Sequence, residues 1–190
     1  MEATATRPRH RFTVKDYHRM GDLGIIRDGA RVELVDGHIL EKPVIGSSHA
    51  GCVDALNRLF VRAVGDRAIV RVQGPVQLDE YSEPEPDLSL LRPRADFYRT
   101  SHPAPQEVLL IIEVSDTSAE FDRRVKAPLY ARAGIPEYWI VDLSRGVVEV
   151  QRSPAEVGYR ERQELRLGDR LEPGTMPDAV LDVAQILGTT

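Results

Sequence analysis

An apolar run that ends in an acid limits the folds open to this chain. The residues from Val108 to Ile112 are all aliphatic, and Glu113 follows them directly. Because side chains alternate between the two faces of a strand, Leu109, Ile111 and Glu113 would share one face. A strand that is apolar on both faces is typical of the centre of a sheet covered by helices. The segment 107–115 therefore predicts a central strand.

Other patterns predict the elements around this strand. Thr13 and Asp16 have capping-box spacing, which favours a short helix over 14–20, and Asp36-Gly37 is typical of a hairpin turn. The elements expected further along are hairpin strands over 31–35 and 38–42, helices over 47–64 (capped by Ser47 or Ser48) and 118–134, and strands over 68–78, 87–91, 137–143, 147–152 and 159–167. Pro128 falls inside the second long helix and should disturb its hydrogen bonding. This order predicts an α/β fold, a mixed sheet flanked by helices with antiparallel hairpins at its margins.

Length, cysteine content and charge narrow the class of protein. A chain of 190 residues fits one domain, which we place over 12–187, with 1–11 as a flexible amino-terminal segment. The single cysteine, Cys52, excludes an internal disulfide, and no apolar run is long enough for a signal peptide or a membrane span. We therefore expect a cytoplasmic protein with no membrane partner. A net charge of -5 argues against a nucleic-acid coat protein but permits an enzyme that contacts nucleic acid through a metal ion.

Two acids at strand ends are the strongest candidates for chemistry. Asp87 begins one expected strand and Glu113 ends another, so their carboxylates would converge if the two strands were neighbours. Hard divalent cations such as Mg²⁺ or Mn²⁺ prefer such oxygen ligands, and the carbonyl of Val114 offers a third. An acid at a strand end is also commonly just a solvated terminus. Glu113 argues against that alternative, because a carboxylate on a buried face is costly unless it is paired or binds metal.

A lysine on the following helix is the third candidate. Lys126 lies four residues after Asp122, and such a pair can simply stabilise an exposed helix. Near a metal, the same lysine can stabilise charge on a phosphate. Phe121, Val125 and Leu129 mark the expected core face of this helix, with Lys126 at its border. Both interpretations stay open at this point.

Several of these motifs occur together in one known family. The chain resembles the Uma-two family of restriction-endonuclease-like proteins, in the PD-(D/E)XK nuclease superfamily, over residues 12–187. The matching motifs are Glu33-Leu34-Val35-Asp36-Gly37, His49, Pro86-Asp87, Ile112-Glu113-Val114-Ser115, Asp122, Lys126, Tyr130 and the run from Gly134 to Asp142. The resemblance implies a restriction-endonuclease-like fold and magnesium-dependent (or manganese-dependent) hydrolysis of phosphodiester bonds in DNA by a homodimer. It also implies that Asp87 and Glu113 bind the metal and that Lys126 is the catalytic lysine.

One position departs from the superfamily pattern. The superfamily's lysine usually lies two residues after the second acid, where this chain has Ser115. Lys126 would have to act from the helix instead. Serine carries no positive charge, so the departure favours an alternative: a catalytically silent module of the same fold that binds nucleic acid or a protein partner. A third alternative is an accessory protein in which Asp87 and Glu113 only end strands.

Other residues are weaker candidates for the site. Glu33 shares a strand face with Val35, and it could add a third acid or be an exposed hairpin charge. His49, Asp122 and Tyr130 are additional candidates by the same resemblance. A histidine such as His49 is more often a surface or capping residue, and packing is the commoner explanation for Tyr130. Asp122 could position Lys126. The segment 92–102 carries Arg92, Arg94 and Arg99 and could contact phosphates, and the chain from Gly168 onward offers no chemistry.

Overall fold

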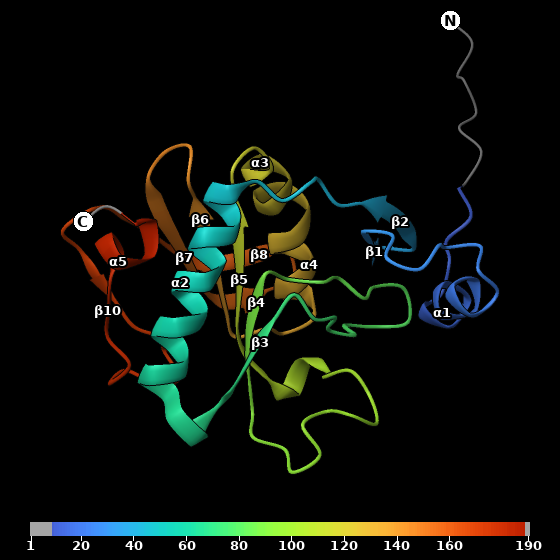
Figure 1. The fold of residues 1–190 in the computed structure, drawn as a ribbon, viewed down its shortest axis with the longest axis horizontal. Helices are drawn as coiled ribbons and strands as arrows, with labels where there is room; N and C mark the ends of the chain where they lie inside the picture. The colour runs from blue at the N-terminus through green and yellow to red at the C-terminus, as the bar shows by residue number, and fades with distance from the viewer. Residues whose placement is uncertain (1–8, 189–190) are drawn as a thin grey trace, which may run out of the picture. The chain divides into compact units, whose positions relative to one another are not determined.

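The computed structural model describes residues 9–188 (Figure 1). Contacts divide the chain into two compact units. The units are Met1–Pro43 with Gln77–Pro84, and Val44–Val76 with Glu85–Thr190. The expected flexible segment 1–11 falls mainly on residues 1–8, which lie outside the described residues. This division by contacts does not test the expectation of one domain over 12–187, which stays a prediction.

The first unit contains a short helix and a hairpin. Its elements are α1 Val14–Asp22, β1 Val32–Val35 and β2 His38–Glu41. The capping box is confirmed, because the Asp16 amide donates to Thr13 Oγ1 at 3.1 Å and the Thr13 amide donates to Asp16 Oδ2 at 3.0 Å. These bonds satisfy two of the amides that a helix start leaves without partners.

The hairpin turn is also confirmed. Asp36 and Gly37 have φ values of 48° and 79°, as a two-residue turn between antiparallel strands requires. A Cβ atom at Gly37 would lie 2.6 Å from Cβ of Arg11, so this position excludes larger residues for a second reason. Leu34 of β1 forms a bridge with Glu83, which joins the segment 77–84 to the hairpin.

The second unit is built on a mixed sheet. Among the described residues this sheet has six strands, in the order β3-β4-β5-β6-β7-β8. Their bounds are β3 Ile69–Val72, β4 Leu88–Leu91, β5 Val108–Ser115, β6 Glu137–Asp142, β7 Val147–Ala155 and β8 Gly158–Leu165. β5 pairs with β4 antiparallel and with β6 parallel, and all eight of its residues are buried. The expected central strand is therefore confirmed.

Helices and short elements complete this unit. They are α2 Ser47–Val64, η1 Gly65–Arg67, η2 Pro105–Glu107, α3 Ala119–Phe121, η3 Asp122–Lys126, α4 Ala127–Arg132, β9 Arg170–Leu171, β10 Leu181–Asp182 and α5 Val183–Leu187. β9 and β10 form a separate two-stranded sheet. The expected cap of α2 is wrong, because Gly46 occupies the N-cap position and gives no side-chain bond. Among residues 9–188, no helix has both the length and the apolar character needed to cross a membrane.

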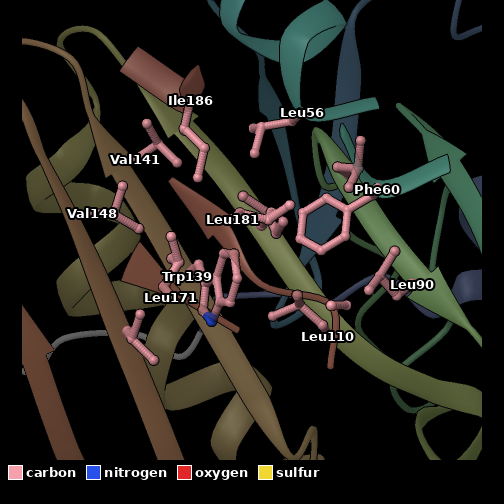
Figure 2. Close-up of a cluster of buried hydrophobic side chains, with 14 of the residues drawn as sticks. Leu56, Phe60, Leu90, Leu110, Trp139, Val141, Val148, Leu171, Leu181 and Ile186 are labelled. Carbon is pink, nitrogen blue, oxygen red and sulfur yellow. The ribbon is translucent and has the colours of Figure 1, made fainter. Parts of the chain in front are cut away.

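One face of the sheet carries the main hydrophobic core (Figure 2). Phe60 of α2 packs on Trp139 of β6, with their ring centroids 5.7 Å apart. Leu110 and Val141 extend this cluster along β5 and β6. Ile186 of α5, near the end of the chain, packs on the same cluster. The tail beyond Gly168, which offered no chemistry in the sequence, thus closes the core.

Two strands differ in length from the sequence prediction. β3 ends at Val72 rather than near Leu78, because Gln73 has a φ of 45° and Gly74-Pro75 cannot continue a ladder. β7 extends through Pro154, where a loop was expected. Its pairing with β6 ends at Arg152, so the missing amide of the proline costs no bond on that side.

Burial of Cys52 makes an alkaline stability loss predictable. The thiol is buried in α2 and donates to the carbonyl of Ile186 in α5 at 3.3 Å, and burial raises its pKa to about 12. The unfolded thiol titrates near pH 8.5, so the folded protein keeps a proton that the unfolded chain releases. Below about pH 8.5 the thiol is protonated in both states and does not change the free energy of unfolding. Above that pH, the free energy of unfolding falls by up to about 1.4 kcal/mol per pH unit because of this thiol.

Urea unfolding between about pH 8 and about pH 10 would measure this loss. Cys52→Ala should flatten the decline over this interval. Buried Tyr138 and Tyr159 also have raised pKa values, but their unfolded forms titrate only near pH 10. An equal slope in the wild type and in the variant would show that Cys52 does not contribute.

Candidate active site

Asp87 and Glu113 occupy neighbouring positions at one end of β4 and β5. Leu88 pairs with Ile112 in the antiparallel ladder, so the next positions outward, Asp87 and Glu113, face each other. Both side chains point to the same face of the sheet, opposite the core face. They are 5% and 4% exposed, respectively. The sequence required the two strands to be neighbours for the acids to converge, and the structure meets that condition.

Hydrogen bonds fix the carboxylate of Asp87 from two sides. Its Oδ2 accepts from the amide of Val114 at 2.9 Å and lies 3.0 Å from Nε2 of His49, in the first turn of α2. Gln73 Nε2 lies 3.4 Å from the other oxygen, Oδ1. His49 thus belongs to the site, as a partner of Asp87. A buried carboxylate held in this way stays in one orientation.

Glu113 is held by the helical segment that follows β5. Its Oε1 accepts from Lys126 Nζ and from Tyr130 OH, each at 2.9 Å. Lys126 is 4% exposed and Tyr130 is fully buried. The charge on Glu113 is therefore compensated inside the protein, which a carboxylate on a buried face requires.

A π-helical turn places the lysine. The helix expected over 118–134 consists of α3, the π-helical η3 and α4, and the amide of Ala127 donates to the carbonyl of Asp122. Pro128 explains why the helix widens here. It has no N–H to donate, and in a regular α-helix its ring would clash with the carbonyl of Arg124. The sequence predicted a disturbance here, and its form is a single wide turn, a feature often found at functional sites.

The wide turn changes which side chains face the sheet. Asp122 and Lys126 are both buried, whereas Phe121 and Val125 of the expected core face are only half-buried. The interpretation of Asp122 and Lys126 as an exposed pair is therefore wrong. Asp122 instead accepts hydrogen bonds from the hydroxyls of Ser115 and Ser118. Burial raises the pKa of the Asp122 carboxyl, while the charge of Lys126 acts in the opposite direction.

An arginine that the sequence analysis missed anchors the same turn. Arg123 forms ion pairs with Asp142 at the end of β6 and with Glu149 of β7, the latter at 2.6 Å. These carboxylates and their hydrogen bonds raise the pKa of the guanidinium. Asp142 is a buried acid at the end of β6, and it was the available signal in the sequence that a cation had to lie opposite it.

Comparisons with known proteins identify the family and the fold. The sequence matches the Uma2 family, described as "Putative restriction endonuclease", over residues 14–184. The chain belongs to the Uma2 family. The crystal structure of "a putative nuclease belonging to DUF820" from Anabaena variabilis ATCC 29413 has the same fold, with a TM-score of 0.74. It is 14% identical, and the alignment covers 93% of this chain and 98% of that one. A search of curated proteins found no match.

Membership in the Uma2 family confirms the expected family and fold. Ser115 occupies the position where the resemblance to the nuclease superfamily led us to expect a lysine. Ser115 is fully buried and donates to Asp122. Lys126 approaches Glu113 from the helix instead. The structure thus shows a lysine beside the second acid although the strand position lacks one.

Other expected site residues stay predictions. Glu33 is 4% exposed in β1 of the first unit, so the interpretation as an exposed hairpin charge is wrong, while its role in a metal site is untested. The segment 92–102 follows the end of β4 remote from Asp87. Arg94 in this segment binds Asp96 at 2.5 Å and lies 4.0 Å from the ring centroid of Tyr98. These internal contacts weaken the case for phosphate binding by this loop.

Proposed function

We propose that this Uma2-family protein is a metal-dependent endonuclease that hydrolyses phosphodiester bonds in DNA. The proposal depends on one arrangement: two buried carboxylates, Asp87 and Glu113, lie opposite each other with their orientations fixed by hydrogen bonds. A lysine contacts one of them, and the family and the similar crystal structure both carry a nuclease description.

The donor set fits a hard divalent cation such as Mg²⁺ or Mn²⁺. Each carboxylate has two oxygens and can accept hydrogen bonds at one while it binds a cation at the other. The amide of Val114 points toward Asp87, and the amide and carbonyl of one strand residue point to the same side. The Val114 carbonyl is therefore directed toward the same place. Asp122 is a further buried acid near this place. The charge of Asp87 is one of the causes that raise the pKa of the Asp122 carboxyl, which indicates that the two acids lie close together.

The residues of the chain have distinct roles in this proposal. Asp87, Glu113 and the Val114 carbonyl would hold the cation, which supplies charge neutralisation at the phosphate and a lowered pKa for its water. Lys126 would stabilise negative charge that develops on the phosphate. His49 and Tyr130 position the two carboxylates through the contacts described above. Asp122 keeps Ser115 and the wide turn in place.

Double-stranded DNA is the proposed substrate, and a homodimer is the proposed assembly. Two copies of one site would allow both strands to be cut. The net charge of -5 permits an enzyme that contacts DNA locally, although it favours the catalytically silent module.

The alternative is a catalytically silent module that binds nucleic acid or a protein. One contact favours it: the ion pair between Lys126 and Glu113 already compensates the acid that a cation would need. A structural ion pair of this kind can persist without any metal. Measurement of metal binding and cleavage together separates the two functions.

Calorimetric titration with Mn²⁺, paired with nicking of supercoiled plasmid, tests the proposal. The wild type should bind the ion and nick DNA only when it is present. Asp87→Asn and Glu113→Gln each remove a ligand charge, so we expect affinity to fall on the order of 100-fold. Glu164→Gln, which changes an acid on the edge strand β8, is the matched control and should leave both measurements unchanged.

Three outcomes have clear meanings. Ion binding without cleavage under any condition would support the silent module. No Mn²⁺ binding by the wild type would contradict the metal-dependent function altogether. Thermal unfolding of each variant must be compared with the wild type, since loss of folding would imitate loss of binding.

A further inference from the structure

A row of buried polar side chains crosses the sheet beside the two acids. Ser89 of β4 pairs with Ile111 of β5, Ile111 pairs with Tyr138 of β6, and Tyr138 pairs with Gln151 of β7. All four side chains therefore point to the same face of the sheet, the face of Asp87 and Glu113. Ser89, Tyr138 and Gln151 are at most 1% exposed.

Each polar member of this row has an atom without a partner. Within the described residues, Ser89 Oγ, Tyr138 OH and Gln151 Oε1 are buried and make no hydrogen bond. Proteins rarely leave buried polar atoms in this state, because each loses its bonds to water and gains nothing in return. A phenylalanine would fill the place of Tyr138 without that loss. The hydroxyl therefore requires an explanation beyond packing.

Two of these atoms belong to positions next to the site. Ser89 follows Asp87 by two residues on the same face of β4. Tyr138 lies across from Ile111, which precedes Glu113 by two residues on the same face of β5. The ring of Tyr138 packs on Tyr130, with centroids 5.0 Å apart, and the hydroxyl of Tyr130 donates to Glu113.

Electrostatics agree with this placement of the Tyr138 hydroxyl. Burial raises the pKa of Tyr138 well above its ordinary value. The charges of Asp122, Glu113 and Asp87 raise it further. The hydroxyl is therefore within reach of the fields of three site acids, while it hydrogen-bonds to none of them.

We infer that the hydroxyls of Ser89 and Tyr138 form a donor pair that holds ordered water against the Asp87 and Glu113 carboxylates when a divalent cation is bound. This inference rests on the proposed metal site and adds two positioning residues to it. A hydroxyl can donate to water while the water donates onward to a carboxylate oxygen, so both orphan atoms gain a partner. The ligands then keep their orientation when the cation arrives.

Gln151 belongs to the same row, but we do not expect it to hold water against the Asp87 and Glu113 carboxylates. It lies on β7, two strands away from Glu113, and its neighbour Glu149 already pairs with Arg123. An unpartnered Oε1 on this residue can be satisfied by a separate buried water. Gln151 is therefore a control with the same burial and an unpartnered oxygen, but this amide oxygen can only accept a hydrogen bond and lies further from the acids.

The test compares Mn²⁺ affinity by calorimetry in Tyr138→Phe, Ser89→Ala and Gln151→Leu, with thermal unfolding of each metal-free protein. We expect Tyr138→Phe to weaken Mn²⁺ binding by about 10-fold, the lower end for loss of a group that supports metal ligands. Ser89→Ala should weaken it in the same direction. Gln151→Leu should bind as the wild type does. Metal-free Tyr138→Phe should unfold at the wild-type temperature or above it, because it loses an unpartnered group.

Unchanged Mn²⁺ affinity in both hydroxyl variants, with normal binding by the wild type, would overturn this inference and leave the proposed function standing. A metal-free Tyr138→Phe that unfolds earlier and binds as the wild type does would assign Tyr138 a purely structural role. Equal weakening in Gln151→Leu would also overturn the inference. If the wild type binds no Mn²⁺, the proposed function fails first, and this inference fails with it.

Discussion

Lys126→Met is expected to lower the free energy of unfolding by about 3–5 kcal/mol, the usual effect of breaking a buried ion pair. The reason is the charge left behind. Glu113 is 4% exposed and would keep only the hydrogen bond from Tyr130 among the two contacts at Oε1. Methionine fills a similar volume, so the loss reports charge rather than packing. Urea unfolding of the metal-free protein at neutral pH measures it.

Two further variants test this cause. Lys126→Met combined with Glu113→Gln removes both charges, and much of the lost stability should return, because a neutral pair costs less to bury than one unpaired charge. Lys15→Met, at an exposed position of α1, should change stability by less than about 0.5 kcal/mol. A double variant less stable than either single variant would contradict the ion-pair explanation.

The second expected result concerns cleavage and separates the lysine from the metal ligands. Lys126→Met should reduce plasmid nicking on the order of 10²–10³-fold, as loss of one preorganised group for transition-state charge does in other enzymes. Mn²⁺ affinity should stay at the wild-type level or increase, because Glu113 no longer shares its charge with the lysine. Single-turnover nicking at saturating Mn²⁺, well below the unfolding temperature, measures this effect.

The comparison with Glu113→Gln completes this experiment. That variant should lose ion affinity and cleavage together, whereas the lysine variant should lose cleavage alone. Wild-type cleavage by Lys126→Met would assign the lysine to stability only. In that case, Lys126 would not supply the positive charge that the lysine absent at Ser115 would otherwise provide.

Local patterns predicted most of the fold correctly. The apolar run before Glu113 indicated a central strand because only a doubly covered strand can be apolar on both faces. Thr13 with Asp16 and Asp36 with Gly37 were confirmed because capping and turn geometry depend on neighbouring residues alone. The cap of α2 was wrong because the helix begins at Ser47, so Gly46 is the N-cap and both serines lie inside the helix.

Contacts between distant segments were harder to predict. Arg123 was missed because its partners Asp142 and Glu149 lie on two later strands. The pair of Asp122 with Lys126 was misread as an exposed one because i, i+4 spacing assumes a regular α-helix. Pro128 signalled the irregularity, but only the packed structure shows that a wide turn directs both side chains inward.

The sequence by itself determined the mixed α/β fold, the family and the three candidate residues Asp87, Glu113 and Lys126, because these depend on periodicity and motif order along the chain. The tertiary structure alone decided that Asp87 and Glu113 face each other, that Lys126 is buried against Glu113, and that Ser89 and Tyr138 stand beside them with unpartnered hydroxyls. The physical reason is strand register. A shift of one residue in the pairing of β4, β5 or β6 would send the strand side chains of this site to the other face of the sheet, away from Lys126.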